Sequence, residues 1–346
     1  MKKILVTGGA GFVGSNLCLQ FSKHNPKTEI IAFDNLKRRG SELNLERFKK
    51  SGIKFLHGDV RNPSDLAEAG EADLILDCAA EPSVLAGTNG SPRYVIETNL
   101  NGTVNVLEHA RTCNAKIIFL STSRVYPIEP INRIPFKETE TRFEWDIDGI
   151  SETFPMEGAR SMYGASKLAS EMLVEEYRAS YGLKAITNRC GVLTGPWQMG
   201  KTDQGVIVLW LAAHYFGTSL SYIGYGGTGK QVRDIMHVDD LFDLLQIQLA
   251  NIDTYDGGVF NVGGGREVSV SLRELTQHCQ EITGKTIPVK SIVEDRPNDL
   301  RVYLTDCNKV KKASGWKPQR GVKQILEEIH VWLKENESSL KKVLIG

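Results

Sequence analysis

The sequence predicts an α/β fold in which helices cover both faces of one doubly wound, parallel sheet. Short apolar runs alternate with longer amphipathic stretches over the first half of the chain, as repeated β-α-β units require. The apolar runs are rich in β-branched residues and nearly uninterrupted, which is typical of parallel strands buried on both faces. They read KILVT from Lys3, EIIAFD from Glu29, IKFLHGD from Ile53, DLILDCA from Asp73 and KIIFLST from Lys116.

The second half of the chain predicts a separate, smaller lobe. Amphipathic segments at 16–23 and 92–112 predict helices between the first strands. Beyond about Lys184 the alternation becomes irregular, with the glycine-rich loops GYGGTGK and NVGGGRE, and 322–336 has the pattern of a helix. We expect a first domain at 1–187 and a smaller C-terminal α/β lobe at 188–346, with part of about 235–262 returning to the first domain.

The charge balance argues against binding to nucleic acid or to a membrane surface. Lys and Arg total 42 of the 346 residues, and Asp and Glu also total 42, so individual charges must hold any ligand. The six cysteines are far apart and form no C-x-x-C or Cys/His cluster, which predicts reduced thiols and no metal site. The chain shows no signal peptide and no apolar run of about 20 residues. We expect a soluble, cytoplasmic protein.

A glycine-rich turn between the first predicted strand and helix indicates a dinucleotide. The segment TGGAGFVGS spaces Gly8, Gly11 and Gly14 three residues apart. Glycine lets the backbone turn tightly and approach a pyrophosphate, whose charge is stabilised by the N-terminus of the next helix. The position between a buried strand and a helix is the context that supports this reading. The sequence thus predicts a Rossmann-type domain whose cofactor contacts this turn, including Phe12 and Val13.

An acidic residue at the end of the second predicted strand indicates which dinucleotide is bound. Asp34 lies where a carboxylate accepts from the adenosine ribose hydroxyls and disfavours a 2′-phosphate. We therefore expect NAD rather than NADP, with Asn35 also in contact with the cofactor. The basic run 37–39 is either a solvated loop or a site for the 2′-phosphate. Asp59 and Val60, at the end of the third strand, are candidates for the adenine edge.

A tyrosine and a lysine share one face of the helix predicted around SMYGASKLASE. Tyr163 and Lys167 are four residues apart, so both side chains reach the same space. A nearby ammonium favours the ionised phenol, and we expect Lys167 to lower the pKa of Tyr163 toward working pH. A chance pair on a surface helix is the alternative.

Six segments occur in an order that resembles a known family. They are TGGAGFVGS, DN at Asp34, GDV at Asp59, NLNGT at Asn99, STSRVY at Ser121 and YGASK at Tyr163. In this order they resemble the extended short-chain dehydrogenases/reductases, and among them the NAD-dependent nucleotide-sugar epimerase/dehydratase family. GKQVRDIMHVDDL and RPNDLR resemble substrate-domain motifs of the same family. The resemblance therefore spans nearly the whole chain and implies NAD binding by the first domain and substrate binding by the second lobe.

The resemblance implies a catalytic group of three side chains. Tyr163 takes a proton from a sugar hydroxyl while the geminal hydrogen leaves as hydride, and Lys167 also holds the nicotinamide ribose. Thr122 is the third member, a donor to the reacting oxygen. Ser123 is the alternative third member. The alternative role for Thr122 is that its hydroxyl only caps a turn at the strand end. A homodimer is also implied by the family.

The same resemblance identifies further contact residues. CAAEPS departs from the family's His-x-Ala-Ala pattern, because Cys78 takes the histidine position. The additional NAD contacts expected are Ala79, Ala80, Glu81, Asn99 and Arg189. The expected substrate contacts are Ser123, Arg124, Asn188, Asp203, Gln204, Gln231, Arg233 and Arg301. Arg233 and Arg301 match diphosphate-binding positions, and a surface salt bridge to Asp234 or Asp299 is the alternative for each.

The residues after Thr122 narrow the reaction. Relatives that dehydrate or decarboxylate a sugar carry carboxylates there, whereas this strip reads Thr122, Ser123 and Arg124. TDQGVIVLW and GKQVRD resemble the CDP-sugar 2-epimerase branch, which implies redox-neutral epimerisation at C2 through a transient ketone. The alternatives are a UDP-sugar 4-epimerase, a nucleotide-sugar reductase or dehydrogenase, and a non-catalytic NAD-binding sensor. We interpret the long insertion at 127–158 as a lid over the sugar.

Overall fold

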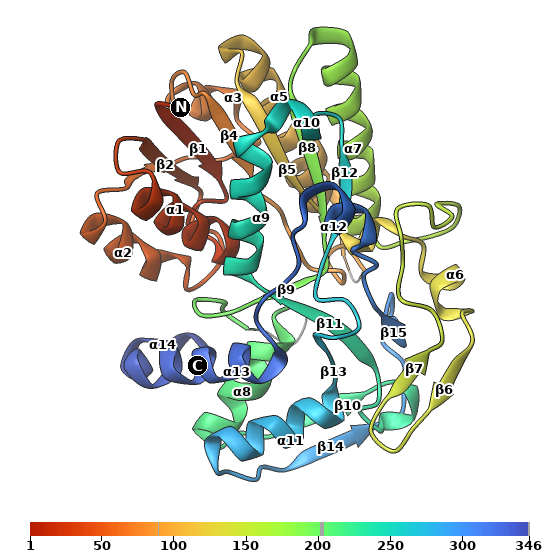
Figure 1. Ribbon diagram of the computed structural model, residues 1–346. Helices are drawn as coiled ribbons and strands as arrows, with labels where there is room; N and C mark the ends of the chain where they lie inside the picture. Colours follow the sequence, from red (N-terminus) through yellow and green to blue (C-terminus); the bar gives the residue numbers. More distant parts are fainter. Residues whose placement is uncertain (89, 201–203, 345–346) are drawn as a thin grey trace. The chain divides into compact units, whose positions relative to one another are not determined.

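The computed structural model describes residues 1–88, 90–200 and 204–344. The chain forms two compact units, each assembled from segments that are distant in the sequence. The sequence colours of Figure 1 show this return of late segments to early ones. Unit 1 consists of Met1–Val125, Ser161–Cys190 and Phe242–Phe260. Unit 2 consists of Tyr126–Arg160, Gly191–Leu241 and Asn261–Gly346.

A seven-stranded sheet forms the centre of unit 1, in the order β12-β8-β5-β4-β1-β2-β3. From β8 to β3 all neighbouring strands pair in parallel. The chain order reverses between β1 and β4, and open α/β sheets bind ligands beyond the carboxyl ends of the strands at such a point. The strands are β1 Lys3–Thr7, β2 Glu29–Asp34, β3 Lys54–His57, β4 Leu74–Asp77, β5 Lys116–Thr122, β8 Ala185–Cys190 and β12 Val259–Val262. The predicted Rossmann-type, doubly wound parallel sheet is confirmed.

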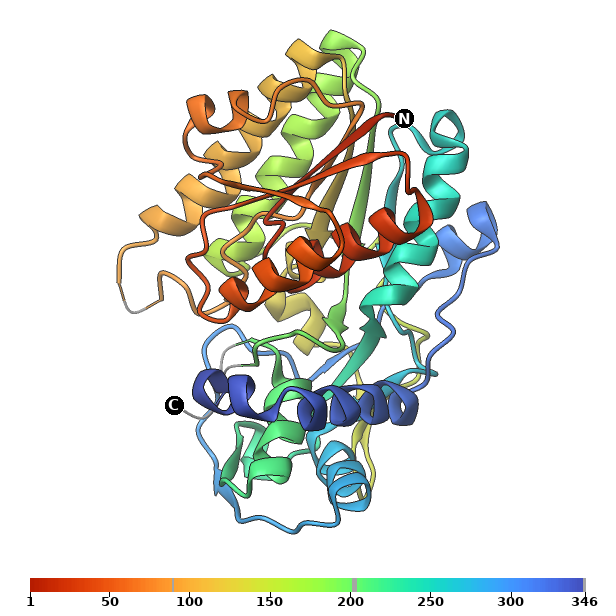
Figure 2. The same ribbon diagram turned by 90° about the vertical axis from the view of Figure 1, so that its left-hand side faces the viewer.

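Helices cover both faces of this sheet. Figures 1 and 2 show α1 and the unit 1 part of α9 on one face, and α3, α5 and α7 on the other. On the second face, Val106, Leu107 and Val174 of the helices join Ile75 and Phe119 of the sheet in one buried cluster. The helices are α1 Phe12–His24, α2 Asn44–Lys50, α3 Pro63–Ala67, α4 Arg93–Ile96, α5 Gly102–Cys113, α7 Met162–Tyr181, α9 Val238–Ala250 and α10 Ile252–Tyr255.

Two of the predicted helices differ from the observed ones. α1 begins at Phe12 rather than at residue 16, and Gly11 precedes it without a side-chain cap, so the sequence holds no polar start signal there. The helix predicted at 92–112 is interrupted between α4 and α5 by a π-helical turn, Glu97–Asn101. Such turns are frequent at functional sites, and this one contains Asn99.

Unit 2 combines small sheets with helices. β11 Val232–His237 pairs in parallel with β9 Val192–Thr194 and β15 Val302–Tyr303, and antiparallel with β13 Ser269–Ser271. β10 Leu220–Ile223 and β14 Val289–Ile292 form a parallel pair. The helices are α6 Ile128–Asn132, α8 Val206–Phe216, α11 Leu272–Thr283, α12 Asn308–Ser314, α13 Val322–Glu335 and α14 Glu337–Leu344. Within the described ranges of both units, no helix has the length and apolar character needed to cross a membrane.

The insertion at 127–158 is built of regular elements. It holds α6 and a hairpin of β6 Phe136–Glu138 and β7 Phe143–Trp145. Lys230 fastens the hairpin within unit 2: its Nζ donates to Glu138 at 2.8 Å, and its carbonyl accepts from Phe143 N at 2.9 Å. The hairpin is therefore a fixed feature of unit 2, and its action as a lid stays a prediction.

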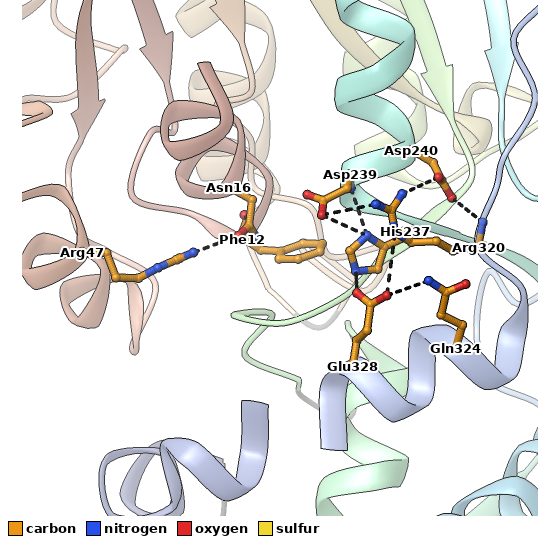
Figure 3. Close-up of polar contacts among 9 residues, drawn as sticks. All are labelled: Phe12, Asn16, Arg47, His237, Asp239, Asp240, Arg320, Gln324 and Glu328. Atoms are coloured by element: carbon orange, nitrogen blue, oxygen red, sulfur yellow. Dashed lines mark hydrogen bonds and ion pairs between the residues drawn. The ribbon is translucent and has the colours of Figure 1, made fainter. Parts of the chain in front are cut away.

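A buried histidine joins β11 to α13 within unit 2, as Figure 3 shows. The ring of His237 accepts at Nδ1 from Asp239 N at 3.1 Å, which leaves the proton of the neutral ring on Nε2. That nitrogen lies 3.2 Å from Glu328 Oε2. Burial lowers the pKa of His237, and the charges of Asp239 and Glu328 oppose this shift. Arg320 donates to Asp240 at 2.6 Å beside them, so the cluster fixes α13 to the end of β11.

Candidate active site

The glycine-rich turn between β1 and α1 has the geometry that a pyrophosphate requires. Gly8 has a φ of +60°, and Gly11 N donates to Gly8 O at 3.0 Å. A Cβ on Gly14 would lie 2.2 Å from Gly8 O, so a side chain there would force the turn apart. α1 starts without a side-chain cap, which leaves its first N–H groups for an anionic ligand. The half-buried Phe12 and Val13 form its first turn.

Asp34 is fixed at the end of β2, beside this turn. Its Oδ2 accepts from Ala10 N at 3.1 Å and its Oδ1 from Leu36 N at 2.8 Å. Burial raises the pKa of Asp34, and these backbone donors oppose the shift. Asn35 Nδ2 donates to Asp59 at 2.9 Å and so joins the ends of β2 and β3. A carboxylate in this position fits a ribose with free hydroxyl groups.

The cations near Asp34 have partners of their own. Arg61 donates to both oxygens of Asp59, at 3.0 and 2.7 Å, and this holds the pKa of Asp59 well below its ordinary value. Lys37 Nζ lies 3.0 Å from the centroid of the Tyr94 ring. The first residue of the basic run 37–39 therefore has a structural contact, and the glycine turn with Asp34 fits NAD.

The structure brings Thr122, Tyr163 and Lys167 together from two elements. Thr122 is the last residue of β5, whereas Tyr163 and Lys167 lie one turn apart near the start of α7. Ser161 caps this helix by accepting from Gly164 N at 3.2 Å. The side chain of Thr122 favours the ionised form of Tyr163 and so acts to lower its pKa. A hydroxyl, a phenol and an ammonium at one strand end are groups that can move a proton to or from an alcohol.

The expectation that the Tyr163 pKa is lowered is wrong for this structure. Burial raises the pKa of Tyr163 and outweighs the opposing effect of the Thr122 side chain. Lys167 is only 2% exposed, and burial lowers its own pKa. Helical spacing correctly predicted a shared face, but the loss of water around both groups depends on the surrounding fold.

The strip after Thr122 carries a cation and no carboxylate. Ser123 is buried in the 3-10 turn η3 Ser123–Val125, and Arg124 is half-buried there. Arg124 N donates to Thr122 Oγ1 at 3.2 Å. The charge of Arg124 favours the ionised form of Tyr163 and so opposes the burial effect on its pKa.

Glu171 is a buried carboxylate that the sequence motifs did not reveal. It follows Lys167 by four residues on α7 and accepts from Ser121 Oγ. Arg189 donates to it through Nε at 3.0 Å and through Nη2 at 2.7 Å. Ser121 and Arg189 are register partners on β5 and β8, so Glu171 fixes the helix of Tyr163 to both strands. Its spacing from Lys167 on one helix face was the available signal.

Asp77 is a second carboxylate that was not predicted. It ends β4, is 2% exposed and accepts from Thr7 Oγ1 at 2.6 Å and from Thr103 Oγ1 at 3.4 Å. Burial raises the pKa of Asp77, and the charge of Lys167 opposes this shift. The charges of Asp77 and Glu171 favour the charged form of Lys167 and so oppose the lowering of its pKa by burial. The acid directly after the apolar residues LIL of DLILDCA was the signal in the sequence.

Asn99 connects the loop after β4 to α7. It is fully buried, and its Oδ1 accepts from Glu81 N at 2.8 Å. Its Nδ2 donates to Glu81 O at 3.2 Å and to Ser166 Oγ at 3.1 Å. Ala79 and Ala80 are half-buried in the loop that Asn99 holds, and Val60 is 6% exposed at the end of β3. Both the oxygen and the nitrogen of the Asn99 side chain are therefore hydrogen-bonded within the protein.

The structure corrects the expectation for Asn188. This residue is fully buried in β8 and exchanges two hydrogen bonds with Gln248, each of 2.9 Å. Its amide is used inside unit 1, so it is not placed to contact a substrate. The neighbouring Arg189 directs its guanidinium at Glu171, as described above, and its expected contact with NAD stays a prediction.

The expected substrate residues of unit 2 differ in their surroundings. Arg233 Nη2 donates to Asp299 at 2.7 Å. This contact is the salt bridge that was expected as the alternative to diphosphate binding. Gln231 is buried and donates to a backbone carbonyl of β10 at 3.1 Å. Gln204 is half-buried just before α8, whereas Asp203 lies outside the described residues.

The second arginine of unit 2 has no such ion pair. Within the described residues, the Arg301 guanidinium contacts aromatic rings instead of a carboxylate, with its Cζ 4.2 Å from the ring centroid of Phe136. Its backbone N donates to Asn132 Oδ1 at 3.0 Å.

Comparison with known proteins agrees with this geometry. A parallel sheet with a glycine-rich turn, a ribose carboxylate and a Thr-Tyr-Lys group defines a dinucleotide-dependent enzyme of alcohol chemistry. Residues 4–263 match the model of the NAD dependent epimerase/dehydratase family. The chain belongs to this family, which confirms the predicted family, NAD as the cofactor and enzymatic activity.

Relatives with different reactions cover nearly the whole chain. CDP-paratose 2-epimerase of Salmonella typhi is 31% identical over 95% of this chain and 98% of its own length. UDP-glucuronic acid decarboxylase 5 of Arabidopsis thaliana is 30% identical over 92% of this chain and 85% of its own. The structure of dTDP-glucose 4,6-dehydratase from Bacillus anthracis in complex with NAD has a TM-score of 0.79 and 26% identity, covering 99% of this chain and all of the other. The chain is therefore similar to enzymes that act on nucleotide sugars.

Proposed function

We propose that this protein catalyses the redox-neutral epimerisation of a nucleotide-diphosphate sugar, and that the substrate is a CDP-sugar inverted at C2. The observation that carries the proposal is the similarity to CDP-paratose 2-epimerase, which spans 95% of this chain and 98% of that enzyme. The strip after Thr122 supports it, because Ser123 and Arg124 offer no carboxylic acid to protonate a leaving hydroxyl or to assist decarboxylation.

In the proposed reaction, Tyr163 acts as the base and Thr122 holds the reacting oxygen. Thr122 donates to the C2 oxygen, and the Tyr163 phenolate takes the hydroxyl proton while the C2 hydrogen leaves with its electron pair. NAD, held by the glycine turn and Asp34, would supply the acceptor and later the donor of this hydride. After the ketone presents its other face, the hydride rejoins C2 and Tyr163 gives the proton back to the oxygen. No net oxidant is consumed.

Lys167 and Arg124 supply the positive charge that the Tyr163 phenolate needs. Burial raises the pKa of Tyr163, so cations close to the phenol must favour its ionised form during turnover. We further propose that Arg301 and Arg233 of unit 2 bind the diphosphate, that Lys167 holds the nicotinamide ribose, and that the enzyme is a homodimer. The remaining expected cofactor and substrate residues keep their proposed contacts, except Asn188.

The cofactor preference is predicted to follow Asp34. We expect calorimetry to give an NAD affinity at least tenfold above that of NADP, because a 2′-phosphate would meet the Asp34 carboxylate. Asp34→Asn should narrow this difference, whereas the distant Asp253→Asn should leave it unchanged. Equal affinities for the wild-type protein would show that the basic run 37–39 dominates.

The function is tested with a panel of CDP-, UDP- and GDP-sugars, without added cofactor and with product analysis by chromatography. An isomerised CDP-sugar that keeps a deuterium label placed at C2 supports the proposal, because the same hydride returns. Isomerisation of UDP-sugars at C4 would identify a 4-epimerase. Turnover that requires added NAD or NADH in equal amount would identify a dehydrogenase or a reductase, and loss of the label to water would indicate enolisation.

A further inference from the structure

Arg301 lies in a cage of three aromatic rings within unit 2. Its guanidinium Cζ is 4.2 Å from the ring centroid of Phe136, 5.2 Å from that of Tyr225 and 5.9 Å from that of Phe143. These distances are in the range of cation–π contacts. Two of the rings come from the β6–β7 hairpin, and Tyr225 comes from the 3-10 turn η4 Tyr225–Gly227.

The three rings also support one another. Phe136 and Phe143 meet edge to face with centroids 5.2 Å apart, and Phe143 and Tyr225 do so at 6.4 Å. Such contacts between rings are favourable beyond their buried area. The main chain of Arg301 is fixed as well, because its N donates to Asn132 Oδ1 and its O accepts from Val232 N, each at 3.0 Å. The main chain of Arg301 is thus fixed by hydrogen bonds, and its guanidinium lies over three aromatic rings.

Three other cations around the hairpin pair with carboxylates, whereas Arg266 donates to the carbonyl oxygens of Trp145 and Ile147 at 2.7 and 2.6 Å. Arg233 pairs with Asp299 at 2.7 Å, and Lys230 pairs with Glu138 at 2.8 Å. Arg142, in the hairpin turn, lies 3.0 Å from Glu274. Among the described residues near the hairpin, Arg301 is held by rings instead.

A ring and a carboxylate hold a guanidinium in different ways. A carboxylate occupies the N–H groups and cancels the charge, so an incoming phosphate must displace it. An aromatic face contacts the flat side of the guanidinium, which leaves the N–H edge and the net charge available for a bidentate contact with phosphate. An arginine in a cage of rings is therefore oriented without losing its capacity to bind an anion.

We propose that Phe136, Phe143 and Tyr225 are positioning residues that hold the Arg301 guanidinium in place for the diphosphate of the substrate. The hairpin of the 127–158 insertion thereby contributes to substrate affinity through Arg301. This inference rests on the proposed function, which makes a nucleotide-diphosphate sugar the substrate.

The experiment is a double-mutant cycle on Phe136 and Arg301, read by calorimetric binding of the probe cytidine 5′-diphosphate to the NAD-loaded protein. Phe136→Leu keeps an apolar side chain but removes the ring. Because Phe136 is 39% exposed, we expect the variant to fold, and its melting temperature checks this. Arg301→Ala should raise the Kd by at least tenfold. Phe136→Leu should raise it about two- to fivefold in the wild-type background and leave it unchanged in the Arg301→Ala background.

Two further variants separate positioning from general effects. Phe136→Trp restores an aromatic face and should return the Kd to within about twofold of the wild-type value. Ile147→Ala truncates a side chain of similar exposure, 41%, in the same insertion, and should leave the Kd unchanged.

The possible outcomes distinguish the inference from the function on which it rests. An equal effect of Phe136→Leu in both backgrounds would overturn positioning, because the ring would then act independently of Arg301. A strong effect of Arg301→Ala with no effect of Phe136→Leu would also overturn it and would leave the proposed function intact. Unchanged binding by Arg301→Ala would remove the diphosphate role of this arginine, and the inference with it.

Discussion

The Tyr163→Phe variant is expected to fold and to bind NAD while its turnover falls by roughly 10²-fold or more, the scale of a positioned acid or base. The substitution keeps the ring and removes only the hydroxyl whose ionised form the Thr122 side chain favours. Lys167 and the glycine turn are unchanged, so cofactor binding should persist. The measurement is single-turnover isomerisation of the substrate identified by the panel, with NAD affinity determined in parallel.

The pH dependence gives this prediction a second readout. Because burial places the pKa of Tyr163 above its ordinary value of 10 in the cofactor-free protein, only the ionised minority is a base at neutral pH. The wild-type rate should rise with pH, since a higher pH deprotonates more of the phenol, and Tyr163→Phe should lack this rise. Tyr181→Phe, on the exposed end of the same helix, is the matched control and should retain normal turnover. Near-normal turnover of Tyr163→Phe would end its assignment as the base.

The strands and the cofactor turn were predictable because both are encoded locally. The segment 116–122 contains the uninterrupted apolar run 117–120, which has few alternatives to a buried parallel strand, and it forms β5 with the same bounds. The turn at Gly8 and Gly11 was equally readable, because Gly8 has a φ of +60° and a Cβ on Gly11 would lie 3.1 Å from Gly8 O. The ends of parallel strands then bring Asp34 and Thr122 to one edge of the sheet.

The charges beneath Tyr163 were not predictable in the same way. Glu171 meets Ser121 and Arg189 only when α7 packs over β5 and β8, and no local pattern encodes that contact. Asn188 lies inside β8, next to the strand that ends at Thr122, and its side chain is paired with Gln248 in the interior. Alternation along a strand shows which residues share a face. How deeply that face is buried, and hence the direction of a pKa shift on it, depends on the helices that pack against it.

Lys167→Met is expected to abolish turnover and also to destabilise the fold, because the ammonium serves two buried carboxylates. Lys167 is 2% exposed and so is Asp77, whose raised pKa is opposed by the Lys167 charge. Removing the Lys167 charge takes away an interaction that favours the ionised form of Asp77, so the free energy of unfolding should fall. The loss should appear as a lower midpoint in urea, and NAD affinity should fall as well if the ammonium holds the nicotinamide ribose.

A second substitution separates the structural part of this effect from the catalytic part. Lys167→Met/Asp77→Asn removes the orphaned carboxylate but keeps an amide for Thr7 and Thr103, so it should recover most of the stability and none of the turnover. The sign of the pH effect follows from Asp77, whose pKa is higher in the folded than in the unfolded protein. The Lys167→Met variant should therefore lose stability as the pH rises from the unfolded to the folded pKa of Asp77. Its deficit should therefore be smallest in acid, and the double variant should show no such trend. Recovery of turnover in the double variant would show that Lys167 only balances Asp77 and has no part in the chemistry.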